Sequence, residues 1–171
     1  LAYQLEAQFR MSALSMRIIH AEKHRKEEDP MRYFIVASHG PLSTAILESA
    51  SLIAGKETFR NFRAIYVTMQ DSPENIRQTV DNCMVDFPEE AEIIALTDVF
   101  GGSVTNILTE YIQSRNLHIV TGMNLGMVID AGFSGVETST EELIEALIHT
   151  GQRGIRCVNS EIDNNELEDE I

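Results

Sequence analysis

Residues 32–56, RYFIVASHGPLSTAILESASLIAGK, decide the fold predicted for this chain. Residues 32–38 are a short apolar run without polar alternation, which is typical of a strand buried on both faces. Residues 40–56 then follow a helical pattern, in which Pro41 suits a first helical position and Gly55 suits the stop. One histidine, His39, stands where the buried strand gives way to the helix.

The same alternation of strand and helix continues along the chain. We expect further strands at residues 63–69, 91–98 and 117–123, and helices at residues 72–87, 102–115, 125–132 and 139–151. Residues 154–159 are a candidate fifth strand. Because the connections are short, the pattern predicts an α/β fold: an open, doubly wound, mainly parallel sheet with helices on both faces.

The two ends of the chain differ from this alternating region. Residues 1–30 end in a charged cluster and Pro30, and we interpret them as an extension outside the fold, either upstream sequence or residues added for expression. Residues 159–171 carry six acidic side chains and no basic one, which is typical of a solvated tail. The single folded domain is therefore predicted to span residues 31–158.

The composition limits the classes of partner. The formal net charge of the 171 residues is -14, and an acidic surface repels phosphate backbones and anionic lipids. An apolar run near the length of a membrane span and a secretory signal pattern are both missing, so we expect a cytoplasmic protein. Cys83 and Cys157 have no metal-ligand spacing and are interpreted as ordinary thiols, and we expect no metal and no cofactor.

Polar residues and glycines gather where three predicted strands end. The first strand ends in Ser38, His39 and Gly40; the third is followed by Asp98 and then by Gly101, Gly102, Ser103 and Asn106; the fourth is followed by Asn124. Ligands of open α/β sheets bind at the carboxyl ends of the strands, where helix N-termini also point. The sequence therefore predicts a site at this edge of the sheet.

His39 and Asp98 are the candidate reactive pair. A carboxylate bonded to one ring nitrogen fixes the tautomer of an imidazole and leaves the other nitrogen as a nucleophile. Amides at the helix start near Pro41 and in residues 101–103 would hold an anion. The lysine of a Walker motif and the GxGxxG spacing of dinucleotide folds are both missing, so the signal for a nucleotide site is weak.

At these three strand ends the chain resembles the IIA domain of the mannose family of the bacterial phosphoenolpyruvate-dependent sugar phosphotransferase system (PTS). The matching stretches are IVASHGPLS, LTDVFGGSVTN and VTGMNLGMV. The resemblance implies that His39 accepts a phosphoryl group from the carrier HPr and passes it to a IIB component, with Asp98 bonded to the ring. It also implies a phosphate pocket, whose members here are Ser38, Gly40, Gly101, Gly102, Ser103 and Asn106.

The resemblance further implies a homodimer in which a carboxyl-terminal strand, here residues 154–158, is exchanged between subunits. The chain departs from the usual family pattern at Phe100, Val104 and Gly126, where tryptophan, proline and proline are common. These changes affect loop stiffness and the pocket wall, and they bear on the substrate subfamily more than on the chemistry.

Three alternative functions remain open from the sequence. One is the phosphotransferase subunit of a dihydroxyacetone kinase system, which has a similar Ser–His strand end. Another is a regulatory binding module that keeps the fold without relaying phosphate. A receiver-like domain phosphorylated on Asp98 is disfavoured, because the first strand does not end in the acidic cluster that a magnesium site needs.

Overall fold

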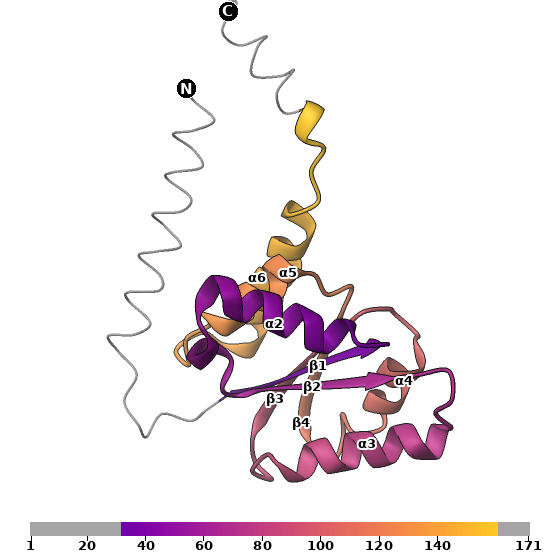
Figure 1. Cartoon of the computed structure of the whole chain (residues 1–171). Coiled ribbons are helices and arrows are strands. Elements are labelled where there is room, and N and C mark those ends of the chain that lie inside the picture. Colours follow the sequence, from indigo (N-terminus) through magenta and orange to yellow (C-terminus); the bar gives the residue numbers. More distant parts are fainter. Residues whose placement is uncertain (1–31, 161–171) are drawn as a thin grey trace, which may run out of the picture.

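The computed structural model describes residues 32–160, and residues 1–31 and 161–171 lie outside the described part. Its centre is one sheet of four parallel strands in the order β2-β1-β3-β4 (Figure 1). The strands are β1 Tyr33–His39, β2 Phe62–Val67, β3 Glu92–Thr97 and β4 Asn116–Thr121. The helices are α2 Leu42–Ala54, α3 Pro73–Val85, α4 Ser103–Thr109, α5 Leu125–Gly132 and α6 Thr140–Arg153, with a short 3₁₀ helix, η1, at Lys56–Phe59.

The α/β class and the four parallel strands are thereby confirmed. The central strands β1 and β3 are the two whose sequences show the most continuous apolar runs, and both are buried along almost their whole length. The edge strands β2 and β4 contain buried, partly buried and exposed residues. The difference follows from position, since helices cover a central strand from both faces and neighbouring strands cover its sides.

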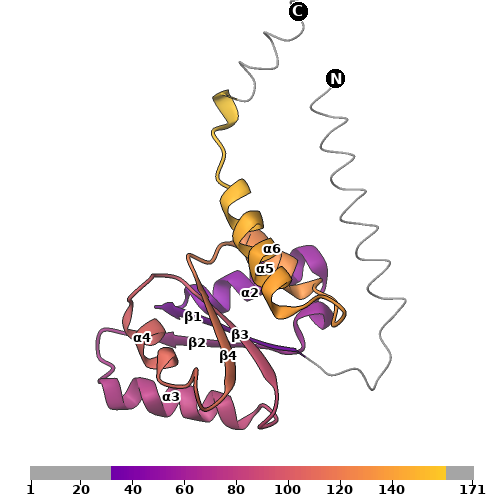
Figure 2. The ribbon, with the colours of Figure 1, turned by 180° about the vertical axis from the view of Figure 1, so that it is seen from behind.

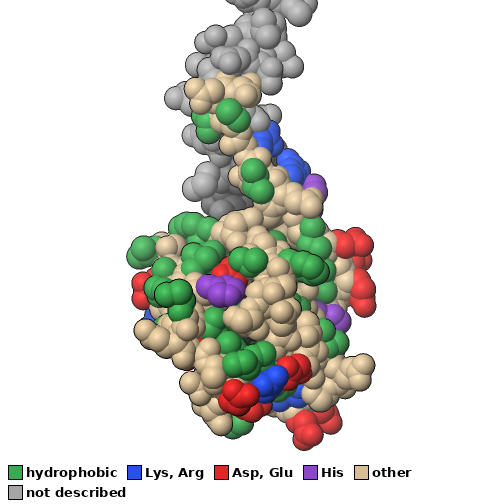
Figure 3. Space-filling model, turned by 90° about the vertical axis from the view of Figure 1, so that its right-hand side faces the viewer, with side chains coloured by type: hydrophobic (Ala, Val, Ile, Leu, Met, Phe, Trp, Pro, Cys, Tyr) green, Lys and Arg blue, Asp and Glu red, His purple; other side chains and the backbone are tan. Residues whose placement is uncertain are grey.

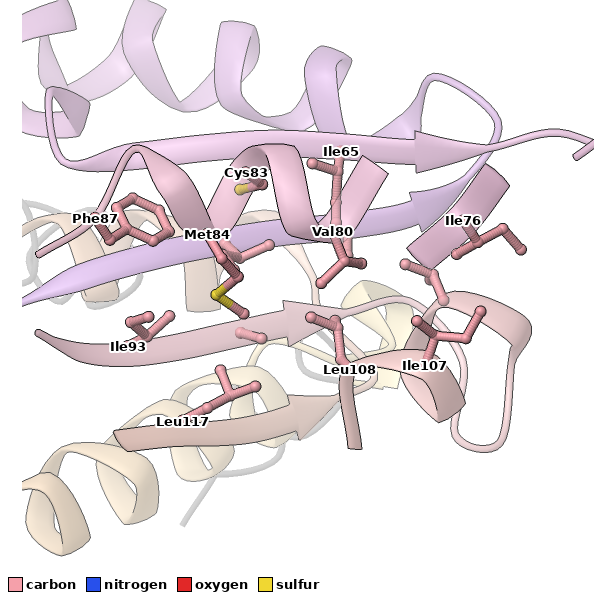
Figure 4. Close-up of a cluster of buried hydrophobic side chains, with 14 of the residues drawn as sticks. Ile65, Ile76, Val80, Cys83, Met84, Phe87, Ile93, Ile107, Leu108 and Leu117 are labelled. Atoms are coloured by element: carbon pink, nitrogen blue, oxygen red, sulfur yellow. The ribbon is translucent and has the colours of Figure 1, made fainter. Parts of the chain in front are cut away.

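Helices cover both faces of the sheet (Figures 1 and 2). On one face, α2, α5 and α6 pack over alternate residues of the central strands, such as Phe34, Val36 and Leu96. On the other face, α3 and α4 pack over the intervening residues, including Ile35 and Ile93 (Figure 4). The period-two alternation of a strand thus divides β1 and β3 between two hydrophobic cores.

Most predicted helix ends lie where the capping residues indicated. Ser72 accepts a hydrogen bond from the Asn75 amide at the start of α3. Ser139 and Glu142 form a reciprocal capping box at the start of α6. Pro41 differs, because it occupies the N-cap position itself and α2 begins one residue later.

The helix predicted over residues 102–115 is shorter than expected, since α4 ends at Thr109. Its continuation is a series of turns in which Glu110 pairs with Arg77 and the Tyr111 hydroxyl donates to Asp81. Both partners lie on α3, so tertiary contacts override the helical pattern of this segment.

The fifth strand predicted over residues 154–159 is not formed in the single chain. Residues 155–157 have no regular structure, residues 158–160 are helical, and all of residues 152–160 are exposed. A strand needs a neighbour for its backbone hydrogen bonds, and α6 leads this segment away from the sheet (Figure 1). Within residues 32–160, we find no helix that is both long and apolar enough to cross a membrane.

Candidate functional site

The topology brings His39 and Asp98 together. β1 lies between β2 and β3, so the strand order reverses beside β1, and ligands of open α/β sheets bind at such a switch point. His39 is the last residue of β1, and Asp98 directly follows the last residue of β3. Because Ala37 is in register with Thr97, the two side chains meet at the carboxyl edge of the sheet.

The Asp98 carboxylate is held by N–H donors from two residues. Its Oδ2 accepts a hydrogen bond from the backbone N–H of His39 at 2.8 Å and lies 3.0 Å from the ring Nδ1 of the same residue. Its Oδ1 accepts a hydrogen bond from the Val99 amide at 2.8 Å. Burial raises the pKa of this carboxyl, but the hydrogen bonds from His39 and Val99 outweigh burial and hold the pKa below its usual value.

This arrangement sets the roles of the two ring nitrogens of His39. Since the carboxylate only accepts, Nδ1 carries the proton of the shared hydrogen bond, and Nε2 keeps its lone pair. Nε2 faces the Ser103 hydroxyl at 3.3 Å. The side chain is 47% exposed, so the ring is accessible to an incoming electrophile.

The glycines after Asp98 allow the loop to approach the ring closely. A Cβ atom at Gly102 would lie 2.6 Å from Cε1 of His39, which is closer than real Cβ contacts. Gly101 has a φ of 73°, a conformation that other residues rarely adopt. Asn106 donates from its side-chain amide to the Gly101 carbonyl at 2.9 Å, which ties the loop to α4.

Ser38 and Gly40 shape the turn that carries His39. The Ser38 side chain is fully buried, and its hydroxyl contacts the backbone on the far side of the turn. Gly40 has a φ of 58° and donates its N–H to the Val67 carbonyl at 2.8 Å. Both residues therefore fix the backbone next to the histidine.

Two of the amides predicted to hold an anion are already engaged. The Gly102 N–H donates to the Val99 carbonyl at 3.1 Å, and the Ser43 N–H donates to the Ser38 hydroxyl at 2.8 Å. The Ser103 hydroxyl, in contrast, lies directly beside the reactive nitrogen. The anion contact that the geometry favours most is therefore a side-chain hydroxyl.

Asn124, which ends the third group of polar residues in the sequence, serves the packing of two helices. Its Oδ1 accepts a hydrogen bond from the Met127 amide and caps α5, while its Nδ2 donates to the Gly151 carbonyl of α6. Of the three strand ends grouped by sequence, two thus supply the His39–Asp98 pair and the third supplies this helix contact.

Exposed apolar side chains surround His39, and among them only Phe100 is identified from the sequence as part of the pocket wall. Figure 3 shows one histidine in the middle of this face, with an acidic side chain beside it and hydrophobic side chains around it. We define the apolar collar as the exposed side chains of the segments that meet at this edge of the sheet: Leu42, Tyr66, Met69, Val99 and Phe100.

Two members of the apolar collar protrude furthest. Met69 is fully exposed at the tip of a turn in which the Asp71 carboxylate accepts hydrogen bonds from the backbone N–H and the hydroxyl of Thr68. Phe100 is 86% exposed in the loop after Asp98. An apolar residue at the centre of the turn sequence TMQD was the available signal for Met69.

Within residues 32–160, no group of three or more His, Cys, Asp or Glu side chains is arranged to hold a metal ion. His118, for example, lies on β4 and contacts Asn116. At the His39 site, the hydrogen bonds present an oriented imidazole beside a hydroxyl group.

Comparison with known proteins agrees with this chemistry. Residues 33–148 match the EIIA-man family model, described as the PTS system fructose IIA component. The fructose-specific EIIA component of Bacillus subtilis (strain 168) is 22% identical over 130 residues, which cover 75% of this chain and 88% of the relative.

Two solved structures share the fold. The mannose/sorbose-specific IIA subunit from Enterococcus faecalis is 24% identical, with a TM-score of 0.68, and the match covers 74% of this chain and 93% of that one. A Klebsiella pneumoniae protein, described as a phosphoenolpyruvate-dependent sugar PTS permease, is 30% identical with a TM-score of 0.68, covering 79% and 96% of the two chains. The chain belongs to the EIIA-man family and is a IIA component, a phosphoryl carrier of a sugar phosphotransferase system.

Proposed function

We propose that His39 is the residue that carries the phosphoryl group, that HPr is its donor and that a IIB component is its acceptor. The observation that supports this assignment most strongly is the orientation of the ring. The ring is half exposed, its Nδ1 is hydrogen-bonded to Asp98, and its Nε2 faces Ser103 at the switch point of the sheet. We place the phosphocarrier domain at residues 31–158 and the relay in the cytoplasm.

In the first step, the Nε2 lone pair of His39 attacks phosphorus in line with the bond to the donor. The N–P bond forms, the bond between phosphorus and the donor breaks, and its electron pair leaves with the donor. The imidazole keeps the Nδ1 proton and gains positive charge, which the adjacent Asp98 carboxylate stabilises. In the second step, a nucleophile of the acceptor forms a bond to phosphorus, the N–P bond breaks, and its electron pair returns to Nε2, which restores the neutral ring.

The groups next to Nε2 suit a reversible transfer. The Ser103 hydroxyl donates to a phosphoryl oxygen, and the backbone of residues 101–103 lines the same side of the ring. Phosphoryl transfer depends mainly on positioning and charge stabilisation. Dipoles of this kind bind the group less tightly than a full positive charge would, so that it can leave again.

The apolar collar is the surface on which the protein partners dock. Phosphoryl transfer between two proteins requires the partner's reactive group to come within bonding distance of Nε2, so the partner must cover the residues around His39. Apolar side chains such as Met69 and Phe100 gain free energy when a partner removes them from water.

The functional unit is a homodimer in which residues 154–158 pair with the sheet of the partner subunit. Two observations support this part of the proposal. Ile155 and Val158 are exposed apolar side chains, Ile155 in the irregular residues 155–157 and Val158 at the start of the helical residues 158–160. Among residues 32–160, β2 and β4 are also the edge strands of the sheet, and edge strands offer backbone groups to a further strand.

The assignment of His39 is tested by incubating the chain with phosphoenolpyruvate, Enzyme I and HPr and measuring its intact mass. We expect the unmodified chain to gain one phosphate and His39→Ala to gain none. His118→Ala is the matched control, and we expect it to be phosphorylated normally, because His118 contacts Asn116 on β4. A phosphohistidine elsewhere in His39→Ala would contradict the assignment.

A further inference from the structure

Ser38 lies directly before His39 and is fully buried. Its hydroxyl accepts a hydrogen bond from the Ser43 N–H at 2.8 Å and donates one to the Gly40 carbonyl at 2.9 Å. The Ser43 N–H belongs to the first turn of α2, where a helix leaves its amides without partners. Pro41 occupies the N-cap of α2, and its side chain makes no capping hydrogen bond. The Ser38 hydroxyl, on β1, therefore caps the N-terminus of α2 in place of the N-cap side chain.

These two hydrogen bonds close the chain around His39. They join residue 38 of β1 to the backbone of residues 40 and 43, so the histidine lies inside the closed turn. Outside this turn, the backbone N–H of His39 donates a hydrogen bond to the Asp98 carboxylate, which follows β3. The direction in which the imidazole leaves the backbone is thus set by the Ser38 hydroxyl from one side and by Asp98 from the other.

We propose that Ser38 is a positioning residue for phosphoryl transfer, whose buried hydroxyl fixes the start of α2 against β1 and so holds the His39 ring in line with the incoming phosphoryl group. The inference rests on the proposed role of His39 and extends it. Ser38 acts through the histidine, since its hydroxyl is turned to the backbone and hidden from solvent.

Ser43 offers a matched control in the same turn. Its side chain is also fully buried, but its hydroxyl oxygen has no hydrogen-bond partner among the described residues. Ser38→Ala and Ser43→Ala thus remove the same atom at sites five positions apart. Only the first substitution breaks bonds to the backbone around His39.

The test measures single-turnover phosphorylation by phospho-HPr over a range of donor concentrations. For Ser38→Ala we expect the maximum rate to fall by about 10- to 100-fold, as for small misplacements of a reacting group. The donor concentration giving half the maximum rate stays unchanged, because the apolar collar is intact. For Ser43→Ala we expect a rate within about twofold of the unmodified chain, since that hydroxyl makes no bond to lose.

Two further measurements test the role of Ser38 even if Ser38→Ala fails to fold. Ser38→Thr retains the hydroxyl, and we expect it to restore the rate. Hydrogen exchange reports the hydrogen bond itself: the Ser43 amide is protected in the unmodified chain and exchanges faster in Ser38→Ala. An unprotected Ser43 amide in the unmodified chain would overturn the proposal without any variant.

The outcomes also separate this proposal from the function on which it rests. Phosphate acceptance by His39→Ala would remove the carrier assignment. If His39→Ala is inactive but folded Ser38→Ala transfers phosphate as fast as Ser43→Ala, only the positioning role of Ser38 is overturned. Equal losses in both serine variants would indicate packing and would overturn it as well.

Discussion

At the scale of single residues, the site depends on one carboxylate that binds both the backbone and the ring of the same histidine. Asp98 accepts from the His39 N–H and faces Nδ1, and its other oxygen accepts from Val99. The backbone bonds fix the carboxylate, and the carboxylate fixes the ring. This position needs a side chain that only accepts hydrogen bonds, because the groups bonded to it, the two backbone N–H groups and Nδ1, are donors.

Asp98→Asn tests this requirement. The new side-chain amide would place an N–H group toward the N–H group at Nδ1 of His39, so two donors would face each other. The conflict is removed if the amide donates to Nδ1. The ring proton then lies on Nε2, which loses its nucleophilic lone pair. A comparable exchange beside the histidine of a serine protease lowers turnover by about 10⁴. We expect phosphorylation by phospho-HPr to slow by about 100-fold or more, with Asp86→Asn, an exposed carboxylate bonded to Arg63, as an unaffected control. Wild-type rates in Asp98→Asn would contradict the orienting role.

The same carboxylate makes stability depend on pH. The pKa of Asp98 is lowered from its ordinary 3.8, so its contribution to the free energy of unfolding is complete above that value and is lost as the pH falls through the folded-state pKa. We expect the stability difference between the unmodified chain and Asp98→Asn to shrink as the pH falls below about 4. Urea unfolding on both sides of this pH measures it, and a difference that grows in acid would contradict the sign.

Gly102→Ala tests the close approach of the loop to the ring. The added methyl group would lie 2.6 Å from Cε1 of His39, so either the ring or the loop must move. We expect the transfer rate to fall by at least about tenfold. Gly126→Ala is the control, because its nearest neighbour would be at 3.5 Å and the site lies within α5. That substitution should stabilise the chain by about 0.5–1 kcal/mol in thermal unfolding and leave the rate unchanged.

At the scale of elements, two loops present the apolar collar to partners. The β2–α3 loop holds Met69 in a turn closed by Thr68 and Asp71, and the β3–α4 loop carries Phe100. We expect Met69→Ser and Phe100→Ser each to raise the donor concentration for half-maximal rate by about fivefold or more, with the maximum rate unchanged. Leu52→Ser is the matched control, since Leu52 is 89% exposed on α2. An unchanged donor requirement in both loop variants would exclude the apolar collar as the docking surface.

The elements that sequence alone predicted well are those whose pattern is local. β1 and β3 follow from uninterrupted apolar runs, and the starts of α3 and α6 follow from Ser72 and Ser139. The meeting of His39 with Asp98 was predictable because both lie at the carboxyl ends of buried parallel strands.

Other features depend on contacts that are distant in sequence. The early end of α4 depends on bonds from Glu110 and Tyr111 to α3, which no local pattern reveals. Asn124 was grouped with the site, but β4 is an edge strand and is separated from β1 by β3, so Asn124 contacts α6 instead. Met69 was assigned to a strand, whereas β2 ends at Val67 and leaves it in the turn.

At the scale of the whole molecule, the reactive nitrogen and the proposed exchange segment belong to different parts of the chain. The His39 site is built from residues of one chain at the carboxyl edge of the sheet. Residues 155–160 extend beyond α6 and are exposed throughout (Figures 1 and 2). Dimerisation through this segment should therefore be separable from phosphate acceptance.

Ending the chain after Gly154 tests this separation. In light scattering, we expect the full chain to have the mass of a dimer and the shortened chain that of a monomer, because Ile155 and Val158 would no longer reach a partner sheet. The shortened chain should keep its cooperative unfolding and gain one phosphate, since the described contacts of the His39 ring come from residues 98–103. Ile155→Asp with Val158→Asp is the matched variant at full length, and it should give the same monomer because burying two carboxylates in an apolar contact is costly. A monomeric full chain, or a shortened chain that remains dimeric, would contradict strand exchange while leaving the phosphoryl carrier assignment intact.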